Sequence, residues 1–183
     1  MNKILVLVLL AILLSLSSIP YFAHAEIKMS APLNWQPDED NNPDGMRWHQ
    51  NSTKSIFSIV KGPENLPVKL DSMGPFLAKQ AENMQTLEST DELSFGHDNY
   101  GYRYFLTFSS PSKLSESLSS SGIALDALIA DMVRDPNDFP FKGMLLLTEK
   151  QGAIYVITFL SPGENFDSVL KELQPSFDSI QIE

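Results

Sequence analysis

The pattern in this sequence that most resembles a binding site is an oxygen-rich loop at residues 40–45. Asp40, Asn42 and Asp44 place oxygen side chains at its first, third and fifth positions, and a glycine follows at the sixth, which matches the start of a calcium-binding loop. The twelfth position holds Asn51 instead of a bidentate glutamate, so calcium would bind weakly, with a dissociation constant on the order of 10⁻⁴–10⁻³ M. The alternative is a Pro-Asp-Gly turn between strands, which we favour because such turns are common.

Candidate catalytic residues are few. After the first 25 residues the chain has two histidines, His49 and His97, and it has no cysteine, which excludes thiolate chemistry, disulfides and zinc sites that need thiolates. His97 and Asp98 could form half of an acid–base pair, but a histidine at a strand end beside a turn aspartate is the simpler interpretation. No hydrolase, metalloprotease or phosphate-loop motif is present. We therefore expect a protein without catalytic residues. We also expect no cofactor, unless the loop at 40–45 binds calcium.

Three tyrosines, Tyr100, Tyr102 and Tyr104, alternate along one strand-like segment and should share one face of it. Aromatic residues at this spacing usually pack against neighbouring strands. The alternative is a partner-binding face, because tyrosine is enriched in protein interfaces.

The N-terminus has the features of a secretory signal peptide. Lys3 precedes an apolar run at 4–16, and Ala23-His24-Ala25 provides a cleavage site after residue 25. The run is too short for a comfortable membrane span, although an uncleaved anchor is the alternative. We expect residues 1–25 to be removed and residues 26–183 to form a single extracytoplasmic domain with no membrane span.

The exported chain is strongly acidic. Without Lys3 it has 12 basic and 23 acidic residues, a net charge of −11. Such a chain is repelled by nucleic acids and by anionic lipid surfaces, so we expect a protein partner and no nucleic acid.

Apolar periodicity and turn residues predict the main elements. We expect strands at 46–49, 56–60, 93–97, 100–108, 144–148, 153–159 and 180–182, and Gly62 and Pro63 should end the second of them. We expect helices at 71–87, at 123–134 and from Phe166 to about Phe177. A serine-rich loop should occupy 109–121. The segment 144–159 has the strongest hairpin signal, with its connection at 149–152. Residues 153–159 are apolar on both faces, so helices should cover both sides of the sheet. The order of elements predicts an α+β fold with a mainly antiparallel sheet.

The same segments resemble the PsbP-like domain of the Mog1/PsbP superfamily. The hairpin 144–159, Ser161-Pro162, the spacing of Phe166 and Phe177, and Ser179-Ile180 are similar to the end of that domain. Pro32-Leu33-Asn34-Trp35 and the order of the earlier elements agree with its beginning. The resemblance covers most of residues 27–182 and implies an α-β-α sandwich around a central antiparallel sheet. Residues 26–183 would form one such domain, with the serine-rich loop and a helical insertion near 109–140.

The resemblance also carries an expectation of function. Members of the superfamily include extrinsic photosystem II subunits, bacterial envelope proteins and a nuclear transport factor, and most are accessory or binding proteins without catalysis. The secretory leader and the insertion depart from the plant photosynthetic members and put a photosystem role in doubt. We expect a non-catalytic accessory protein that acts through protein contacts at the cell envelope; the alternatives are a calcium-responsive extracytoplasmic module and, least favoured, a hydrolase.

Overall fold

The computed structural model describes residues 27–37, 45–64, 86–110 and 135–183. Five predictions lie wholly or mostly outside these ranges: the signal peptide at 1–25, the loop that contains Asp40, Asn42 and Asp44, the helix at 71–87, the serine-rich loop at 109–121, and the helix at 123–134. They remain predictions.

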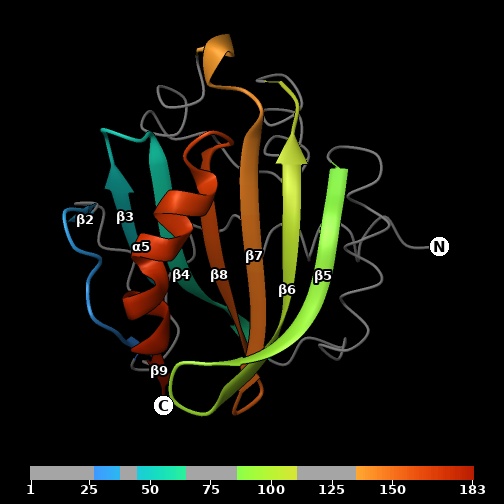
Figure 1. The fold of residues 1–183 in the computed structure, drawn as a ribbon. Coiled ribbons are helices and arrows are strands. Elements are labelled where there is room, and N and C mark those ends of the chain that lie inside the picture. Colours follow the sequence, from blue (N-terminus) through green and yellow to red (C-terminus); the bar gives the residue numbers. More distant parts are fainter. Residues whose placement is uncertain (1–26, 38–44, 65–85, 111–134) are drawn as a thin grey trace.

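A seven-stranded antiparallel sheet dominates the described part of the chain (Figure 1). Its strands follow the spatial order β2-β3-β4-β8-β7-β6-β5. Their bounds are β2 Gln36–Pro37, β3 Gly45–Gln50, β4 Ser55–Glu64, β5 Thr86–Phe95, β6 Asn99–Phe108, β7 Phe141–Lys150 and β8 Ala153–Pro162. Each strand pairs with its neighbours in antiparallel register, as the sequence predicted.

The hairpin β7–β8 forms the centre of this sheet. Gln151 and Gly152 connect the two strands with φ of 52° and 80°, and a two-residue turn with two positive φ values fits the twist of a hairpin. β8 lies between β4 and β7. Tyr155, Ile157 and Phe159 point to one face and are at most 1% exposed, so the prediction of a buried inner strand at 153–159 is confirmed.

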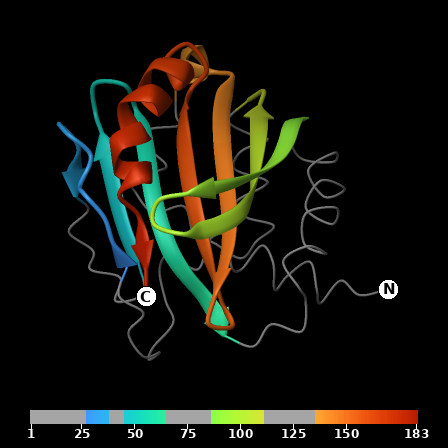
Figure 2. The ribbon, with the colours of Figure 1, turned by 60° about the horizontal axis from the view of Figure 1, so that its bottom comes forward.

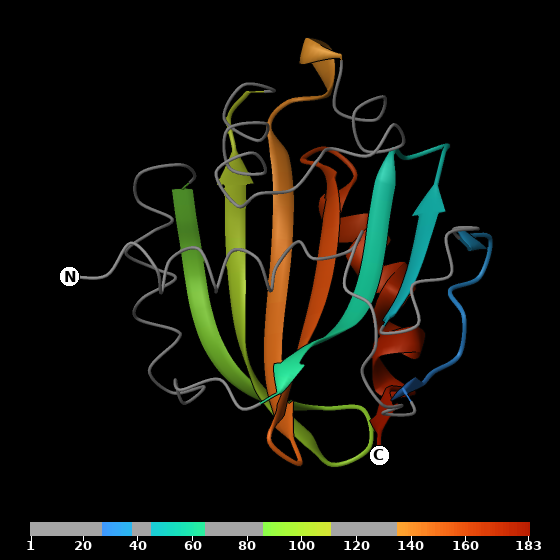
Figure 3. The same ribbon diagram turned by 180° about the vertical axis from the view of Figure 1, so that it is seen from behind.

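One face of the sheet is covered by helix α5, Phe166–Asp178 (Figures 1 and 3). Its apolar side is buried against β4, β7 and β8 and consists of Phe166, Val169, Leu173 and Phe177. The Phe159 ring stacks on Phe166 at 5.0 Å between centroids, and Phe57 meets Phe177 edge-to-face at 5.2 Å. Burial of such side chains stabilises the fold by about 1.5–3 kcal/mol each.

The opposite face of β8 is buried as well. Ile154 and Val156 point to it and are 3% and 2% exposed. The helices that we expected on this face fall outside the described residues. The α+β class with one helical layer on an antiparallel sheet is confirmed.

Several predicted boundaries differ from those in the structure. The helix at 71–87 cannot reach its predicted end, because Thr86 and Leu87 already belong to β5 and pair with β6. The strand predicted at 93–97 therefore starts earlier, and it ends at Phe95. In both cases pairing with β6 outweighs the local apolar pattern. Likewise, β4 continues through Gly62 and Pro63 to Glu64, with an irregular register that accommodates a proline.

The two ends of the described chain meet in a second, two-stranded sheet. β1 (Ile27–Lys28) pairs with β9 (Gln181–Ile182), which confirms a short terminal strand. Lys28 Nζ lies 2.6 Å from Glu183 Oε1 across this pair. Within the described ranges, no helix is long and apolar enough to cross a membrane.

Candidate functional site

The tip of the β5–β6 hairpin folds toward the C-terminal end of α5 (Figure 2). The carbonyl oxygen of Ile180 accepts two hydrogen bonds there, from the backbone N–H of His97 at 2.8 Å and from Nδ2 of Asn99 at 3.1 Å. Gly96 makes the close approach possible, because a Cβ at this position would lie 2.1 Å from the same oxygen. Its φ of +53° also favours glycine. The hairpin tip is thus held against the end of the helix.

A hollow of about 550 Å³ lies beside this contact. We call it the hairpin hollow. It is lined by Ser94, Phe95, Gly96, Asp98, Asn99, Tyr100 and Asp178. The hairpin supplies six of these residues and α5 supplies one, so the hollow exists only because the tip is held at the helix end.

The hairpin hollow is negatively charged. Asp98 and Asp178 are both exposed, and Asp178 is the last residue of α5. The carbonyl end of a helix carries partial negative charge of its own, yet the last turn of α5 contains no basic residue. The neutral Gln174 side chain donates to Asp178 Oδ1 at 2.7 Å. No lysine or arginine is among the lining residues that the structure describes, so the charge of these residues favours a positively charged group.

Tyr100 forms an aromatic wall of the hollow. Its side chain is 50% exposed, and its ring meets Tyr102 edge-to-face at 6.1 Å between centroids. Its hydroxyl donates to the Glu92 carboxylate. This hydrogen bond, with burial and the nearby charge of Glu92, raises the pKa of Tyr100 to about 12. The phenol therefore stays protonated at neutral pH, as a tyrosine with the ordinary pKa of 10.0 also does.

Asn99 is the buried member of the hollow. It is 3% exposed, and Nδ2 is committed to Ile180. Within the described residues, the amide oxygen Oδ1 has no hydrogen-bond partner. Buried polar atoms are nearly always paired, so this oxygen is an exception, and it has almost no accessible surface of its own.

The predicted tyrosine face is divided between core and surface. Tyr104 is 3% exposed, and burial raises its pKa to about 12. Tyr102 is half-buried, and Tyr100 is exposed. The prediction of a partner-binding face is untested, and only Tyr100 and Tyr102 are open to a partner in this structure.

The two histidines lie on separate elements. His49 is on β3, where its Nε2 contacts Gln36 Oε1 at 3.1 Å. His97 is exposed in the β5–β6 turn, and no hydrogen bond joins it to Asp98 in the described part of the chain. Over the same ranges, no group of three or more His, Cys, Asp or Glu residues is placed to hold a metal ion.

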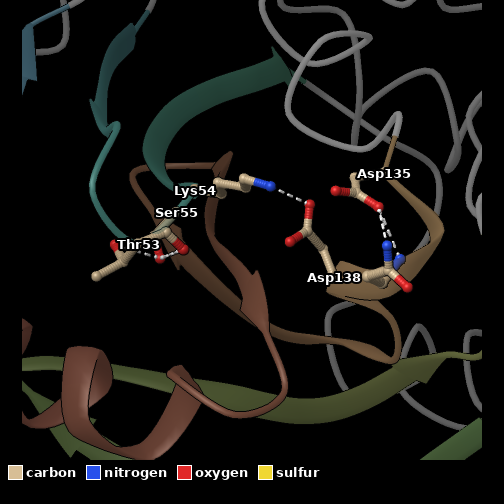
Figure 4. A network of polar contacts seen from close by, with 6 residues as sticks. Thr53, Lys54, Ser55, Asp135 and Asp138 are labelled. Atoms are coloured by element: carbon tan, nitrogen blue, oxygen red, sulfur yellow. Dashed lines mark hydrogen bonds and ion pairs between the residues drawn. The ribbon is translucent and has the colours of Figure 1, made fainter.

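A second polar network ties the turn at 135–138 to the turn between β3 and β4 (Figure 4). Lys54 Nζ lies 2.5 Å from Asp138 Oδ2, and the hydrogen bond to Asp138 raises the pKa of Lys54. Nearby, Asp135 Oδ1 accepts two hydrogen bonds from Asn137. The Lys54 charge is matched within the network, so we interpret this cluster as structural.

The sequence patterns did not predict that the residues lining the hollow lie together. Asp98 was noted only beside His97, and neither Asn99 nor Asp178 was singled out. Asp98 and Asp178 are far apart in sequence, and only the folded hairpin brings them together. The one local feature of the sequence that marks this place is the turn at 96–98. In the structure its Gly96 and Asp98 adopt φ of 53° and 58°.

The chain was compared with known proteins. No protein-family model matches the sequence, and no curated protein matches it either. Among solved structures, LpqN from Mycobacterium tuberculosis, which is involved in cell envelope biogenesis, aligns with a TM-score of 0.50 at 10% identity over 87% of this chain and 84% of LpqN. Cyanobacterial PsbP (CyanoP) from Synechocystis aligns with a TM-score of 0.50 at 8% identity over 92% of this chain and 99% of CyanoP.

A protein from Bacteroides thetaiotaomicron aligns at 12% identity with a TM-score of 0.48 over 86% of this chain. The chain spans 45% of the length of that protein. At these identities the likeness to LpqN and CyanoP concerns the fold. The antiparallel sheet and its helix confirm the fold expected from the resemblance, and the chain has a PsbP-like fold.

Proposed function

We propose that this chain is an exported, non-catalytic accessory protein that binds a protein partner through the hairpin hollow and Tyr100. The observation that carries the proposal is the half-exposed Tyr100 ring beside a hollow lined by two carboxylates. Tyrosine is among the residues that contribute most to protein interfaces.

Tyr100 is suited to binding because it is fixed before a partner arrives. Glu92 holds its hydroxyl, and Tyr102 packs against its ring. An aromatic side chain that is already ordered loses little conformational entropy on binding.

The extracytoplasmic location in this proposal is supported by the secretory pattern of residues 1–25. LpqN, which shares the fold, is involved in cell envelope biogenesis. A position in the envelope is compatible with a protein whose partner is another envelope protein.

Site-specific photo-cross-linking tests the proposal. A photoreactive phenylalanine analogue is placed at position 100 in the native host, and the products are identified by mass spectrometry. Leu33 is a matched control position, because it is also a large exposed hydrophobic residue, 83% exposed, and it lies in a turn outside β6. We expect one defined protein partner to cross-link from position 100 and not from position 33. The same products from both positions, or none from position 100, would contradict the proposal.

A further inference from the structure

We propose that the partner protein adds an extended, basic segment to the outer edge of β5. This inference rests on the proposed function and specifies how the partner is held. Three features of β5 carry it: its open backbone edge, its exposure and its negative charge.

The two edges of the seven-stranded sheet differ (Figures 1 and 3). β2 forms one edge with two residues, and the second of them is Pro37, which cannot donate a backbone hydrogen bond. β5 forms the other edge with ten residues, and it contains no proline and no lysine. Proteins commonly protect a sheet edge by shortening it or by placing proline or lysine on it. β5 has none of these protections, so its backbone is suited to pairing with a further strand.

The outer side of β5 is open in the described part of the chain, where β5 pairs with β6 alone. Residues 88–92 are all exposed, and so is Ser94. The register with β6 shifts at Glu88, so regular pairing geometry runs over 89–95. The N–H and C=O groups on the outer side of this stretch match the backbone of an extended segment, which is the basis of binding by strand addition.

The charge of β5 selects the kind of segment that fits. The strand carries three acidic residues and no basic one. Two of them have cations nearby, because Asp91 pairs with Arg103, and Glu88 lies 3.9 Å from Lys142. Glu92 accepts a hydrogen bond from a neutral tyrosine hydroxyl, and no ion pair joins it to another described residue. A lysine or arginine opposite Glu92 on an added strand supplies the missing cation.

The same charges disfavour a second copy of this chain as the occupant. Pairing of two β5 strands would bring acidic residues of both copies close together, and like charges on paired strands are destabilising. The whole chain is strongly acidic, which adds repulsion between copies. A basic segment is attracted by both the strand and the chain.

The edge of β5 leads into the hairpin hollow. Ser94 and Phe95 line the hollow, and the Glu92 carboxylate holds the Tyr100 hydroxyl. A segment that pairs with β5 therefore lies beside the residues through which we propose that the partner binds. Strand addition and the Tyr100 contact form one continuous surface.

The test is an NMR titration of the ¹⁵N-labelled protein with short peptides. The probe is a peptide in which lysine and valine alternate, so that its lysines share one face of an extended chain. The charge-matched control is the same peptide with every backbone amide N-methylated, which cannot donate hydrogen bonds to a strand. A second control replaces each lysine by threonine, which removes the charge and keeps the strand propensity.

We expect the lysine peptide to produce saturable shifts at the amides of residues 89–94 and to slow their hydrogen exchange. The methylated peptide should bind more than about tenfold more weakly, because the strand hydrogen bonds are lost. The threonine peptide should bind several-fold more weakly, because the charge is lost. Equal binding of the methylated peptide, or an absence of saturable shifts in β5, would overturn the inference.

Variants connect the binding to Glu92. Glu92→Gln removes the carboxylate that has no cation, and we expect the affinity for the lysine peptide to fall several-fold. Glu172→Gln is the matched control, because Glu172 is exposed on α5 and the change of charge is the same. It should leave the affinity unchanged. Equal losses in the two variants would show that the peptide responds only to net charge, and the inference would be wrong.

The two proposals fail separately. If a partner cross-links from position 100 but the lysine peptide does not pair with β5, the proposed function stands and the strand-addition inference is wrong. If the peptide pairs with β5 but no partner cross-links from position 100, the edge of β5 accepts a strand and the proposed role of Tyr100 is wrong.

Discussion

The side-chain amide of Asn99 donates a hydrogen bond to the backbone carbonyl of Ile180, 81 residues further along the chain. The same oxygen accepts the backbone N–H of His97 at 2.8 Å. These two bonds join the β5–β6 tip to the C-terminal end of α5 and bring Asp98 and Asp178 to one hollow. The shape of the hairpin hollow therefore depends on a long-range contact that can be tested by substitution.

The first prediction concerns Asn99 itself. Asn99→Ala should lower the free energy of unfolding by about 1 kcal/mol, because Ile180 loses one of its two donors. Asn99→Asp should cost more, because a carboxylate would then face the Ile180 carbonyl without a proton to donate. Urea denaturation of both variants measures the difference. An unchanged midpoint for Asn99→Ala, or a milder effect of Asn99→Asp, would contradict this account of the contact.

The second prediction compares two glycines at positive φ. In Gly96→Ala the new Cβ would lie 2.1 Å from the Ile180 carbonyl oxygen, and we expect a loss of about 3 kcal/mol. Gly152 is the control, because its φ is +80° and no atom lies within 4 Å of an added Cβ. Gly152→Ala should cost about 1 kcal/mol from backbone strain alone. Thermal denaturation measures both, and equal losses would show that the close approach at Gly96 is unimportant.

The third prediction tests the packing of α5 on the sheet. Leu173 is 0% exposed at the centre of the helix contact. Leu173→Ala should lower the free energy of unfolding by about 2–5 kcal/mol through lost burial and a cavity. Leu33→Ala makes the same chemical change at a residue that is 83% exposed, so it should change stability by less than about 0.5 kcal/mol. Similar losses in the two variants would be incompatible with this placement of the helix.

The elements that the sequence predicted well are those whose signal is local. The hairpin β7–β8 combines two apolar runs with Gln151-Gly152, and both are visible within twenty or so residues. The apolar spacing from Phe166 to Phe177 likewise predicts the buried side of α5. The start of β5 was missed because Leu87 continues a helix-like apolar spacing, and only its pairing with Leu106 makes it a strand residue.

The candidate site was less predictable for a physical reason. Alternation placed Tyr100, Tyr102 and Tyr104 on one face, but it could not tell that Tyr104 lies deeper in the sheet, where it is buried. The hollow depends on the bend of the hairpin toward α5, and this bend is fixed by Ile180 near the end of the chain. No local pattern encodes a contact of that sequence separation.

The fourth prediction addresses the loop at 40–45, which is outside the described residues. We favour a turn over a calcium site there, so calcium should leave the melting temperature unchanged relative to a chelator. If Asp40, Asn42 and Asp44 bind the ion instead, calcium should raise the melting temperature. In that case Asp40→Asn/Asp44→Asn should abolish the shift, and the calcium-responsive alternative would replace the turn interpretation.

The fifth prediction concerns the titration of Tyr100. The hydrogen bond to Glu92 is the main cause that raises its pKa from 10.0 to about 12. The folded protein therefore holds the phenolic proton more tightly than the unfolded chain. The stabilisation from this contact is complete below pH 10 and disappears as the pH rises through about 12. Ultraviolet titration of tyrosinate, with Tyr100→Phe to assign the step, measures this pKa.

Glu92→Gln provides the decisive comparison for that titration. The glutamine amide oxygen still accepts a hydrogen bond, but the substitution removes the negative charge that favours the protonated phenol, so the pKa of Tyr100 should fall toward its ordinary value of 10.0. Glu172→Gln is the control, because Glu172 is exposed on α5 and makes the same change of charge. It should leave the Tyr100 step in place. A Tyr100 pKa that is indifferent to Glu92→Gln would mean that the ring is not held by this carboxylate, and Tyr100 could not then serve as a pre-ordered wall of the hollow.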